Sequence, residues 1–582
     1  MSANAFWPIV IELLLAGAIS VPFGRYLARV FQERKTLLDP ILGPVDRLIY
    51  RIIGREAVKE GMGWKGYVAH MLLTNLLMGL MIGAILSFQA HLPWNPLKFP
   101  DVPPWLAFNT ATSFITNTNW QNYGGESTLS LFSQMAAITF PMFTSAATGL
   151  VVAIAFFRAI SPNRDKGQVL GNFYHDFVRV LTRVFLLPCL FITPILVWQG
   201  SPETLTGVVT AHLIQGGVQH IPLGPVADLE AIKHLGTNGG GFFNANSAHP
   251  FENPTPLSNV IETLLMMVSP MALVVAFGRM VGNPKLGRVI YTIMASMLVV
   301  ALCTAVIAEQ RGTPLLAHAG LMQHASAGQM GGNMVGKEVR FGITQSALFD
   351  TVSTAFTTGT VNSMLDSYTP AGGMVSLVQM MLNCVFGGLG VGMLNFLMFG
   401  IFAVFIAGLM VGRTPEFLGK KIEKREIVLA SLALLVHPLI ILVPTAWSLM
   451  APYGVHSLGN VGSHGLSEVL YAFTSAAANN GSAFAGLNGD TTWYNAALAV
   501  VMLVGRYASV IFMLALGGSL AAKPCVQETV GTLRTDTVLF GGFWFATIVV
   551  VGALTFFPAL VLGPIAELGA LYTHHASMGV IR

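Results

Sequence analysis

The segment Thr237-Asn238-Gly239-Gly240-Gly241-Phe242-Phe243 lies between two long apolar runs and has three counterparts in the chain. Two of them read Thr357-Thr358-Gly359-Thr360-Val361-Asn362 and Asn479-Asn480-Gly481-Ser482. The counterpart nearest the N-terminus lacks glycine and reads Thr116-Asn117-Thr118-Asn119-Trp120-Gln121. The four segments recur at an interval of roughly 120 residues, which indicates large structural repeats and not a solenoid.

This residue pattern suits the binding of a dehydrated alkali cation. Such an ion needs several oxygen ligands at one depth in a membrane, and an extended backbone supplies them when its carbonyls turn inward. Glycine favours that turn because it reaches positive φ without a Cβ penalty, and Thr and Asn add side-chain oxygens. Each segment also follows a short stretch typical of a capped helix, whose C-terminal dipole would face the ion. One copy alone would read as a turn, but four copies at one interval favour a ring.

The composition is that of an integral membrane protein. The chain has 582 residues, of which 53% are apolar and 10% are charged, whereas globular domains carry about 25% charged residues. The four cysteines show no spacing typical of a metal cluster or a disulfide scaffold. The sequence contains no P-loop and no dinucleotide-binding pattern. We therefore expect no covalently bound cofactor, no metal other than an ion at the four segments, and no nucleic acid partner.

Ten apolar segments are long enough to cross a bilayer, which takes about 20 residues each. The run 373–411 is too long for one straight span, and its glycines at 387–392 predict a kink or an unwound turn. The expected fold is an all-α polytopic membrane protein with four helix–pore loop–helix repeats and a separate first and tenth helix. The segments fall near 5–30, 66–90, 129–157, 175–199, 257–281, 286–309, 373–411, 426–450, 493–520 and 536–563.

Lysine and arginine are distributed very unevenly between the two sets of loops. If the N-terminus lies outside, one basic residue, Arg506, lies inside a span, and 24 of the 31 Lys and Arg residues lie on the inner side. This pattern satisfies the positive-inside rule and places all four pore-loop segments on the outer side. Of the 31 Lys and Arg residues, the outer side holds only Lys98, Lys233, Arg311, Lys337, Arg340 and Arg582.

Several charged residues near the pore loops allow two interpretations. Asp228, Asp350 and the pair Ser467-Glu468 could cap short helices, and their charge could also attract cations to the outer side. Arg506 could belong to a structural ion pair. It could instead lie below the loops, where its charge would stop a cation from running straight through. In the inner loop after 411, Arg413 could contact lipid headgroups or a partner.

Long stretches of this sequence resemble the KdpA family, the potassium-binding subunits of bacterial Kdp potassium-transporting ATPases. The stretch from Thr237 to Pro254, TNGGGFFNANSAHPFENP, is the most specific of them. The resemblance runs essentially from end to end of the chain. The other matching stretches are 116–121, 336–342, 407–416, 419–421 and 471–487.

The resemblance implies a potassium filter that passes the ion sideways, through a tunnel in the membrane, to a partner that hydrolyses ATP. It also implies that Gln121 affects potassium affinity, that Arg506 faces the tunnel and that Arg413 lies in a loop that contacts the ATPase subunit. The aspartyl-phosphate motif DKTGT is absent, as expected for a subunit that is not catalytic by itself. The potassium-binding residues that it implies are Asn117, Thr118, Asn119, Thr237, Asn238, Gly239, Thr358, Gly359, Asn479, Asn480 and Gly481.

The resemblance further implies a complex in the bacterial plasma (inner) membrane. Its partners would be a P-type ATPase subunit (KdpB), two single-span subunits (KdpC and a KdpF-like peptide) and membrane lipids. The expected division of the chain follows the repeats. It has an N-terminal helix with a basic loop (1–63), repeats at 64–160, 161–283, 284–412 and 413–522, and a C-terminal helix (523–582).

Two other functions are compatible with parts of the pattern. A Trk/Ktr-like potassium uptake channel has the same repeat unit, but the specific 237–254 stretch and the tenth helix argue against it. An intramembrane enzyme would need carboxylates, or a His with a carboxylate, paired within the spans. His70, His437 and Glu262 look isolated in the sequence, so we expect them to be ordinary helix residues.

Overall fold

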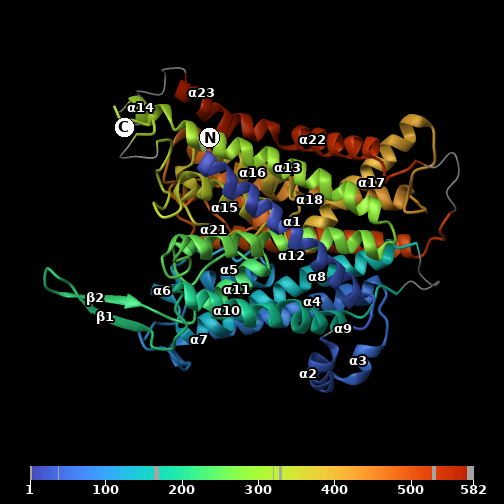
Figure 1. The fold of residues 1–582 in the computed structure, drawn as a ribbon, viewed down its shortest axis with the longest axis horizontal. Coiled ribbons are helices and arrows are strands. Elements are labelled where there is room, and N and C mark those ends of the chain that lie inside the picture. Colours follow the sequence, from blue (N-terminus) through green and yellow to red (C-terminus); the bar gives the residue numbers. More distant parts are fainter. Residues whose placement is uncertain are drawn as a thin grey trace.

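The computed structural model describes residues 3–36, 38–162, 169–318, 320–326, 331–526 and 533–572. In this part of the chain, ten helices are long and apolar enough to cross a membrane, which confirms the expected number. They lie side by side in one bundle (Figure 1). Arg582, assigned above to the outer side, is outside the described residues. The spans are α1 (Ala3–Phe31), α4 (Trp64–Ser87), α7–η2–α8 (Leu131–Ile160), α9–η3–α10 (Phe173–Gln199), α12 (Pro256–Met280), α13 (Pro284–Arg311), α17 (Val391–Val411), α18 (Lys424–Met450), α21 (Thr492–Ala521) and α22–η6–α23 (Val538–Tyr572).

The spans differ in how far the protein itself covers them. The apolar window of the third span, Leu131–Ile160, is 89% buried, whereas that of α18 is only 17% buried. The third span is therefore central, and α18 has most of its surface available to acyl chains.

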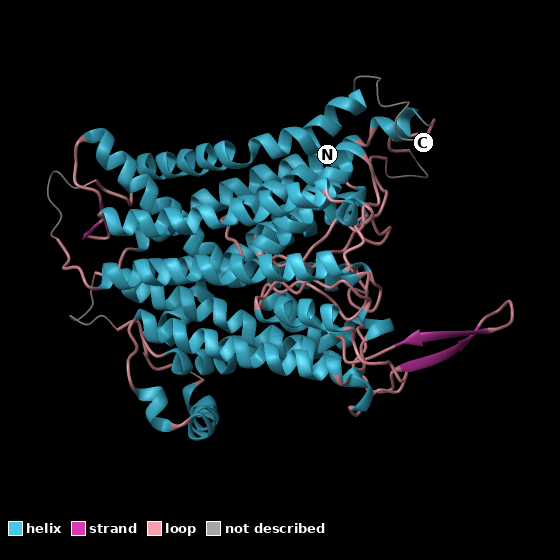
Figure 2. Cartoon of the chain, turned by 180° about the vertical axis from the view of Figure 1, so that it is seen from behind, coloured by secondary structure: helices cyan, strands magenta, loops and turns pink. Residues whose placement is uncertain are grey.

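Four short helices enter the bundle from one end and stop inside it. Each is too short to cross a bilayer, and each lies between two spans of one repeat. The loops that follow them lie inside the bundle, in the half nearer the β-hairpin (Figure 2). These pore helices are α5 (Pro104–Ile115), α11 (Ala227–Leu235), α15 (Gly342–Ala355) and α20 (Gly462–Ala478).

The predicted interruption of the run 373–411 is confirmed. Helix α16 (Pro370–Leu382) ends before residues 383–390, which are not helical, and α17 follows them. Asn383 and Gly390 have positive φ, at 44° and 91°. A Cβ at Gly390 would collide with the carbonyl oxygen of Gly149. Glycine is thus required where the broken segment crosses α8 (Phe140–Ile160).

The all-α expectation holds for the spans but omits two small hairpins. β1 (Val208–His212) and β2 (Val218–Pro222) pair antiparallel and project from the outer end (Figure 1). β3 (Glu416–Phe417) and β4 (Lys420–Lys421) form a short hairpin in an inner loop. The remaining elements are α2 (Asp39–Ile53), α3 (Arg55–Lys59), η1 (Gln89–His91), α6 (Gly125–Thr128), η4 (Asn246–Ala248), α14 (Pro314–His318), η5 (Leu365–Ser367) and α19 (Pro452–Val455). Helix α7 is Leu131–Ser133, η2 Gln134–Thr139, α9 Phe173–Val180, η3 Leu181–Leu186, α10 Leu187–Gln199, α22 Val538–Leu560, η6 Val561–Ile565 and α23 Ala566–Tyr572.

Candidate ion-binding site

All four pore helices pass into their loops through the same backbone hydrogen bond. In each repeat, a carbonyl near the helix end accepts the N–H of the second loop residue, at 2.8–3.0 Å. This shared bond fixes one common register for the four loops. The donor and acceptor pairs are Thr118 to Ser113, Asn238 to Lys233, Thr358 to Ser353 and Asn480 to Ser475.

Loop residues are counted here from Asn117, Thr237, Thr357 and Asn479. The first residue so counted has positive φ in every loop, although none of the four is glycine. The values are 60° at Asn117, 49° at Thr237, 52° at Thr357 and 56° at Asn479. Such φ values are uncommon for residues other than glycine and are costly for a β-branched residue such as Thr. The chain therefore turns at the same point in each repeat, just after the pore helix ends.

We expected the glycine at the third loop position to have positive φ, and in one repeat it does not. Asn119, Gly359 and Gly481 have positive φ, whereas Gly239 does not, and in its loop Gly240 has positive φ instead (74°). The expectation that Gly239 is glycine because of its φ is therefore wrong. The close approach of other loops explains this glycine instead.

Carbonyl oxygens from the three other loops converge on Gly239. A Cβ built on Gly239 would lie 2.8 Å from the carbonyl oxygen of Asn480, 3.0 Å from that of Thr118 and 3.1 Å from that of Thr358. These three residues occupy the same register in their loops. The four loops therefore meet around one point and present backbone oxygens to it, the arrangement in which carbonyls replace an ion's hydration shell.

The other two glycines are held equally closely. A Cβ at Gly359 would collide with the carbonyl of Asn480, and one at Gly481 would collide with the carbonyl of Thr118. Any side chain at these positions would have to displace backbone of a neighbouring loop. Their positive φ adds a second reason for glycine.

Asparagine side chains link the loops to one another. Asn117 Nδ2 donates to the carbonyl of Thr237 at 2.9 Å, and Asn479 Nδ2 donates to Thr118 Oγ1 at 3.0 Å. Asn480 Nδ2 donates to the carbonyl of Ser353 at 3.1 Å. These amides, which the sequence pattern suggested as extra ion ligands, thus hold the ring together.

Four further residues of the predicted set have other surroundings. Thr237 Oγ1 accepts the N–H of Leu389 in the broken segment, at 3.0 Å. Asn238 Nδ2 donates to a carbonyl of its own pore helix, that of Ile232, at 3.2 Å. The amide of Asn119 and the hydroxyl of Thr358 are buried, and neither has a hydrogen-bond partner among the described residues. Asn238 Oδ1 is likewise buried without a partner among the described residues, so these three side-chain oxygens of the predicted set are available to a ligand.

Gln121 joins the first loop to the second. Its Oε1 accepts the N–H of Gly241 at 2.8 Å, and its Nε2 donates to the carbonyl of Gly241 at 3.0 Å. The side chain therefore pairs with both polar groups of one glycine, in the loop that contains Gly239. This contact gives Gln121 a direct means of setting the geometry of the ring.

A serine in three of the pore helices was not recognised as functional from the sequence. Ser353 Oγ accepts the N–H of Gly359 at 3.0 Å, and Ser475 Oγ accepts that of Gly481 at 3.0 Å. Ser113 Oγ donates to the carbonyl of Trp120 at 3.0 Å. The repeat interval that relates the loops also relates these serines, so it could have identified them. In the second repeat the equivalent residue is Lys233.

Lys233 is the centre of a buried ionic network behind the second loop. Its Nζ lies 2.8 Å from Glu230 Oε1, 2.7 Å from Glu252 Oε2 and 3.0 Å from Asn246 Oδ1. Glu252 Oε1 accepts the N–H of Phe243 at 2.7 Å. The side chains of Lys233, Glu230 and Glu252 are completely buried. Although burial opposes charge, the two carboxylates raise the pKa of Lys233 above its usual value.

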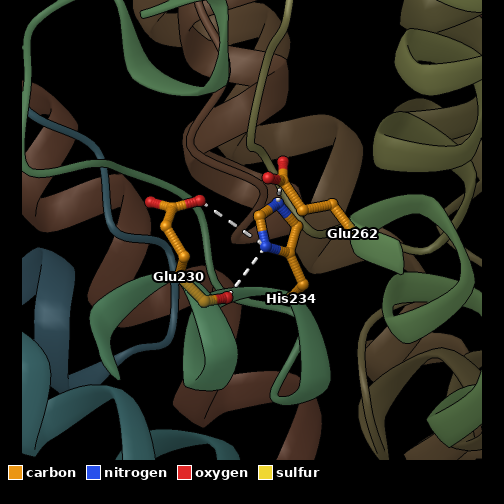
Figure 3. A group of neighbouring side chains, drawn as sticks. All are labelled: Glu230, His234 and Glu262. Carbon is orange, nitrogen blue, oxygen red and sulfur yellow. Dashed lines mark hydrogen bonds and ion pairs between the residues drawn. The ribbon is translucent and has the colours of Figure 1, made fainter. Parts of the chain in front are cut away.

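His234 extends this network to α12, as Figure 3 shows. Its Nδ1 lies 2.9 Å from the carbonyl oxygen of Glu230, which can only accept, so Nδ1 carries a hydrogen. Its Nε2 lies 3.3 Å from Glu262 Oε2. This contact is an ion-pair distance and not a hydrogen bond, because Nε2 and both Glu262 oxygens are buried without a hydrogen-bond partner among the described residues. Glu262 is therefore not isolated, contrary to the expectation from the sequence.

The trio in Figure 3 also offers the donor types of a metal site, with ligand atoms within 4.8 Å of one another. Lys233 already neutralises Glu230, so an added metal cation would lie beside a buried ammonium group. These contacts favour a structural role for the cluster. The other two residues that the sequence suggested were isolated contact single groups: His70 contacts the hydroxyl of Tyr174, and His437 the carbonyl of Met380.

The capping interpretation is wrong, because none of these side chains makes the cap hydrogen bond of its helix, and the N-cap of α11 is Val226. Asp350 lies in the interior of α15 and accepts the hydroxyl of Ser376 at 2.7 Å. Glu468 lies in the interior of α20 and accepts from Asn460 Nδ2 at 2.6 Å. Asp228 does lie in the first turn of α11, where it accepts the N–H of Leu229.

Arg506 is buried beneath the loops without an acidic partner among the described residues. Its Nη2 lies 3.5 Å from the carbonyl oxygen of Ser145, and it lies beside Gly149 of α8. The ion-pair interpretation is therefore wrong. Arg413, by contrast, is exposed in the inner loop after α17.

A cavity of about 40 Å³ lies next to the loops and the broken segment. Its lining includes Asn383, Asn395, His437, Asn479 and Gly505. A water occupies about one probe sphere of 10–15 Å³, so the cavity can accommodate an ion with little accompanying water. Residues of the fourth loop, α18 and α22 all line it.

The model of the KdpA family, described as the potassium-transporting ATPase A subunit, matches residues 10–568. The chain belongs to this family. Among its relatives are proteins named potassium-transporting ATPase potassium-binding subunit from Alicyclobacillus acidocaldarius and Geobacillus kaustophilus. They are 52% and 51% identical to it, each over 97% of this chain and 99% of the relative.

The structure is also similar to that of the potassium transporter TrkH from Vibrio parahaemolyticus. The TM-score is 0.50 at 16% sequence identity, covering 88% of this chain and 98% of that chain. This likeness confirms the fold of four helix–pore loop–helix repeats. The Trk/Ktr-like function considered above is not supported, because the family match is to KdpA.

Proposed function

We propose that this chain is the potassium-binding subunit of an ATP-driven potassium uptake complex and that it selects K⁺ where its four pore loops meet. The observation that carries the proposal is the convergence of the Asn480, Thr118 and Thr358 carbonyls on Gly239. Backbone carbonyls at one depth are the ligands that K⁺ filters use. The pore helices end at the loops, so their negative dipole ends favour a cation there.

The full set of proposed binding residues follows the common register of the loops. Its members contribute in two ways: some supply oxygens to the ion, and others, such as Asn117 and Asn479, fix the neighbouring loop. Gln121 acts on affinity through Gly241. The residues are Asn117, Thr118, Asn119, Thr237, Asn238, Gly239, Thr358, Gly359, Asn479, Asn480 and Gly481.

The ion would then leave sideways instead of crossing to the inner side. Arg506 supports this route because it is a buried cation with no carboxylate beside it in the described part of the chain, so it repels K⁺ from the direct path. The cavity lined by Asn383 and Asn395 offers polar groups on the side of α18 and α22. The partner that receives the ion and hydrolyses ATP would be the P-type ATPase subunit KdpB, with Arg413 at the contact. The complex would also contain KdpC and a KdpF-like subunit, and it would lie in the bacterial plasma membrane.

The test is the potassium-stimulated ATPase activity of the purified complex across a potassium titration, with wild type compared with Gly239→Asp. A large rise in the half-saturating K⁺ concentration, with the complex still assembled, is expected. An unchanged titration would contradict the proposed site. For Arg506→Ala, we expect ATP hydrolysis with less K⁺ moved per ATP in reconstituted vesicles, and an unchanged ratio would assign Arg506 a structural role.

A further inference from the structure

Helix α2 presents an apolar stripe that the rest of the chain leaves uncovered. Ile41, Val45, Leu48 and Ile52 follow the spacing of one helix face, and they are 69%, 39%, 58% and 79% exposed. The helix has 15 residues and includes Asp46 and other charged residues, so it is too short and too polar to be a span. Contact with acyl chains along a span therefore does not explain this stripe.

A different face of α2 is firmly attached to the bundle. Asp46 forms an ion pair with Arg183 of η3 and accepts the hydroxyl of Thr182 at 2.9 Å. Asp39 also pairs with Arg183, at 3.1 Å. Leu42 is buried on this side. Because these contacts fix the rotation of the helix about its axis, the exposure of the apolar stripe is built into the fold.

The position of α2 places it at the level of a membrane surface. It lies beside the bundle, at the end opposite the β1–β2 hairpin (Figure 1). Figure 2 shows it nearly end-on while the spans lie in the plane of the picture, so its axis crosses the direction of the spans. Residues 32–38 connect it to the end of α1, and α3 with residues 60–63 connects it to the start of α4. These short connections keep it close to the ends of two spans.

The charges beside the apolar stripe indicate which kind of membrane surface it contacts. Arg47 and Arg51 are exposed on the polar side of the same helix, at the end of the bundle that the positive-inside pattern assigns to the cytoplasm. An amphipathic helix with basic residues beside an apolar face typically lies in the plane of an anionic membrane, its apolar face at the boundary between headgroups and acyl chains. The inner leaflet carries a negative surface potential that attracts such residues.

We propose that α2 is an in-plane membrane helix that inserts Ile41, Val45, Leu48 and Ile52 into the inner leaflet and binds anionic phospholipid headgroups through Arg47 and Arg51. It anchors the chain beside the α9–η3 segment, independently of the ion site. A partner subunit that covers the stripe is the competing occupant, and the test separates the two.

The test places the photocrosslinking residue p-benzoylphenylalanine at Leu48, and separately at Ile52, in the complete complex. The complex is reconstituted into vesicles of phosphatidylethanolamine with phosphatidylglycerol, and the products are identified by mass. We expect phospholipid adducts at both positions, as at the lipid-exposed control Leu439 of α18, and fewer adducts with the probe at Arg47. Crosslinks to another protein subunit, or no adduct at 48 and 52 while Leu439 reacts, would overturn the proposal.

A second arm tests the charge. The yield of adducts at Leu48 should fall severalfold when phosphatidylcholine replaces both lipids. In the double variant Arg47→Gln/Arg51→Gln, the yield should be equally low in either membrane. A yield that is the same in both membranes for the wild-type arginines would remove the anionic headgroup from the proposal.

Discussion

The second pore loop and the other three reach the same arrangement by different means. In repeats one, three and four, a serine of the pore helix ties the loop through its hydroxyl, as Ser353 does with the N–H of Gly359. In the second repeat Lys233 replaces this serine, and its ammonium group holds Glu230 and Glu252 behind the loop. The backbone bond from the N–H of Asn238 to the carbonyl of Lys233 is nevertheless the same. The common helix end thus sets the register, and the support behind each loop can vary.

The second loop needs a different support because of its glycines. It contains three consecutive glycines, of which Gly239 receives carbonyls from all three other loops and Gly241 is held by Gln121 of the first loop. A chain of glycines loses much conformational freedom on folding, so it needs restraint from outside. The ionic network and Gln121 supply that restraint on its two sides. The ring is therefore only approximately fourfold, and the second loop is the one most dependent on tertiary contacts.

The largest expected effect on K⁺ binding is at the point where the loops meet. Gly239→Ala places a methyl group about 3 Å from three carbonyl oxygens and should raise the half-saturating K⁺ concentration on the order of 100-fold, a loss of about 2.8 kcal/mol in binding. Potassium-stimulated ATPase activity measures this change. Gly83→Ala on α4 is the matched control, because its Cβ would meet nothing within 4 Å. Equal titrations for the two variants would contradict the convergence of the loops.

Removing the ammonium group of the network should cost more stability than removing a serine hydroxyl. Lys233→Met leaves Glu230 and Glu252 buried without their partner, which costs about 3–5 kcal/mol. The expected result is a lower thermal midpoint of the complex together with weakened K⁺ binding. If Lys233→Met lowered the thermal midpoint and weakened K⁺ binding no more than Ser353→Ala does, the ionic network and the serine hydroxyl would be equivalent supports.

Loss of the contact between Gln121 and Gly241 should affect K⁺ affinity more than assembly of the complex. Gln121→Ala removes two hydrogen bonds to Gly241, each worth about 1 kcal/mol, and should raise the half-saturating K⁺ concentration roughly 10- to 30-fold. Titration of the ATPase activity of the assembled complex checks this. Gln121→Glu keeps the bond from the N–H of Gly241 but loses the donor to its carbonyl. If its effect were as large as that of Gln121→Ala, the bond from the N–H of Gly241 would contribute nothing to K⁺ affinity.

The smallest effects are expected at the serines. Ser353→Ala and Ser475→Ala each remove one hydroxyl that accepts a loop N–H, and a hydrogen bond of about 1 kcal/mol corresponds to roughly a fivefold change. Ser353 Oγ also donates to the carbonyl of Thr360 at 2.6 Å, so Ser353→Ala should raise the half-saturating K⁺ concentration more than Ser475→Ala does. An equal effect of the two variants would show that this second bond contributes nothing to K⁺ affinity.

Much of this architecture could be predicted from the sequence, because long-range hydrophobic patterning dictates it. The ten spans, the interruption after α16 and the four pore loops follow from apolar runs, glycines and a repeat interval. The polar supports could not be predicted in the same way. Lys233 and Glu252 read as charges of an outer loop, and only the packing of α11 against α12 places Glu262 beside His234.

The individual glycine conformations were also beyond the sequence. All three of Gly239, Gly240 and Gly241 can adopt positive φ, and the neighbouring loops decide that Gly240 does and Gly239 does not. Likewise, Thr237 and Thr357 adopt a conformation that their residue type disfavours. The surrounding loops impose these choices, so the sequence of a single loop does not reveal them.

The most direct test of the ion site is to locate the ion itself. Crystals or frozen grids of the complex prepared in Rb⁺ or Tl⁺, which substitute for K⁺, should show a bound cation next to Gly239, in contact with the carbonyl oxygens of Thr118, Thr358 and Asn480. The same preparation of Gly239→Asp should lack it. A cation found only elsewhere, with the space between the four loops empty in the wild type, would contradict the proposal that this chain selects potassium there.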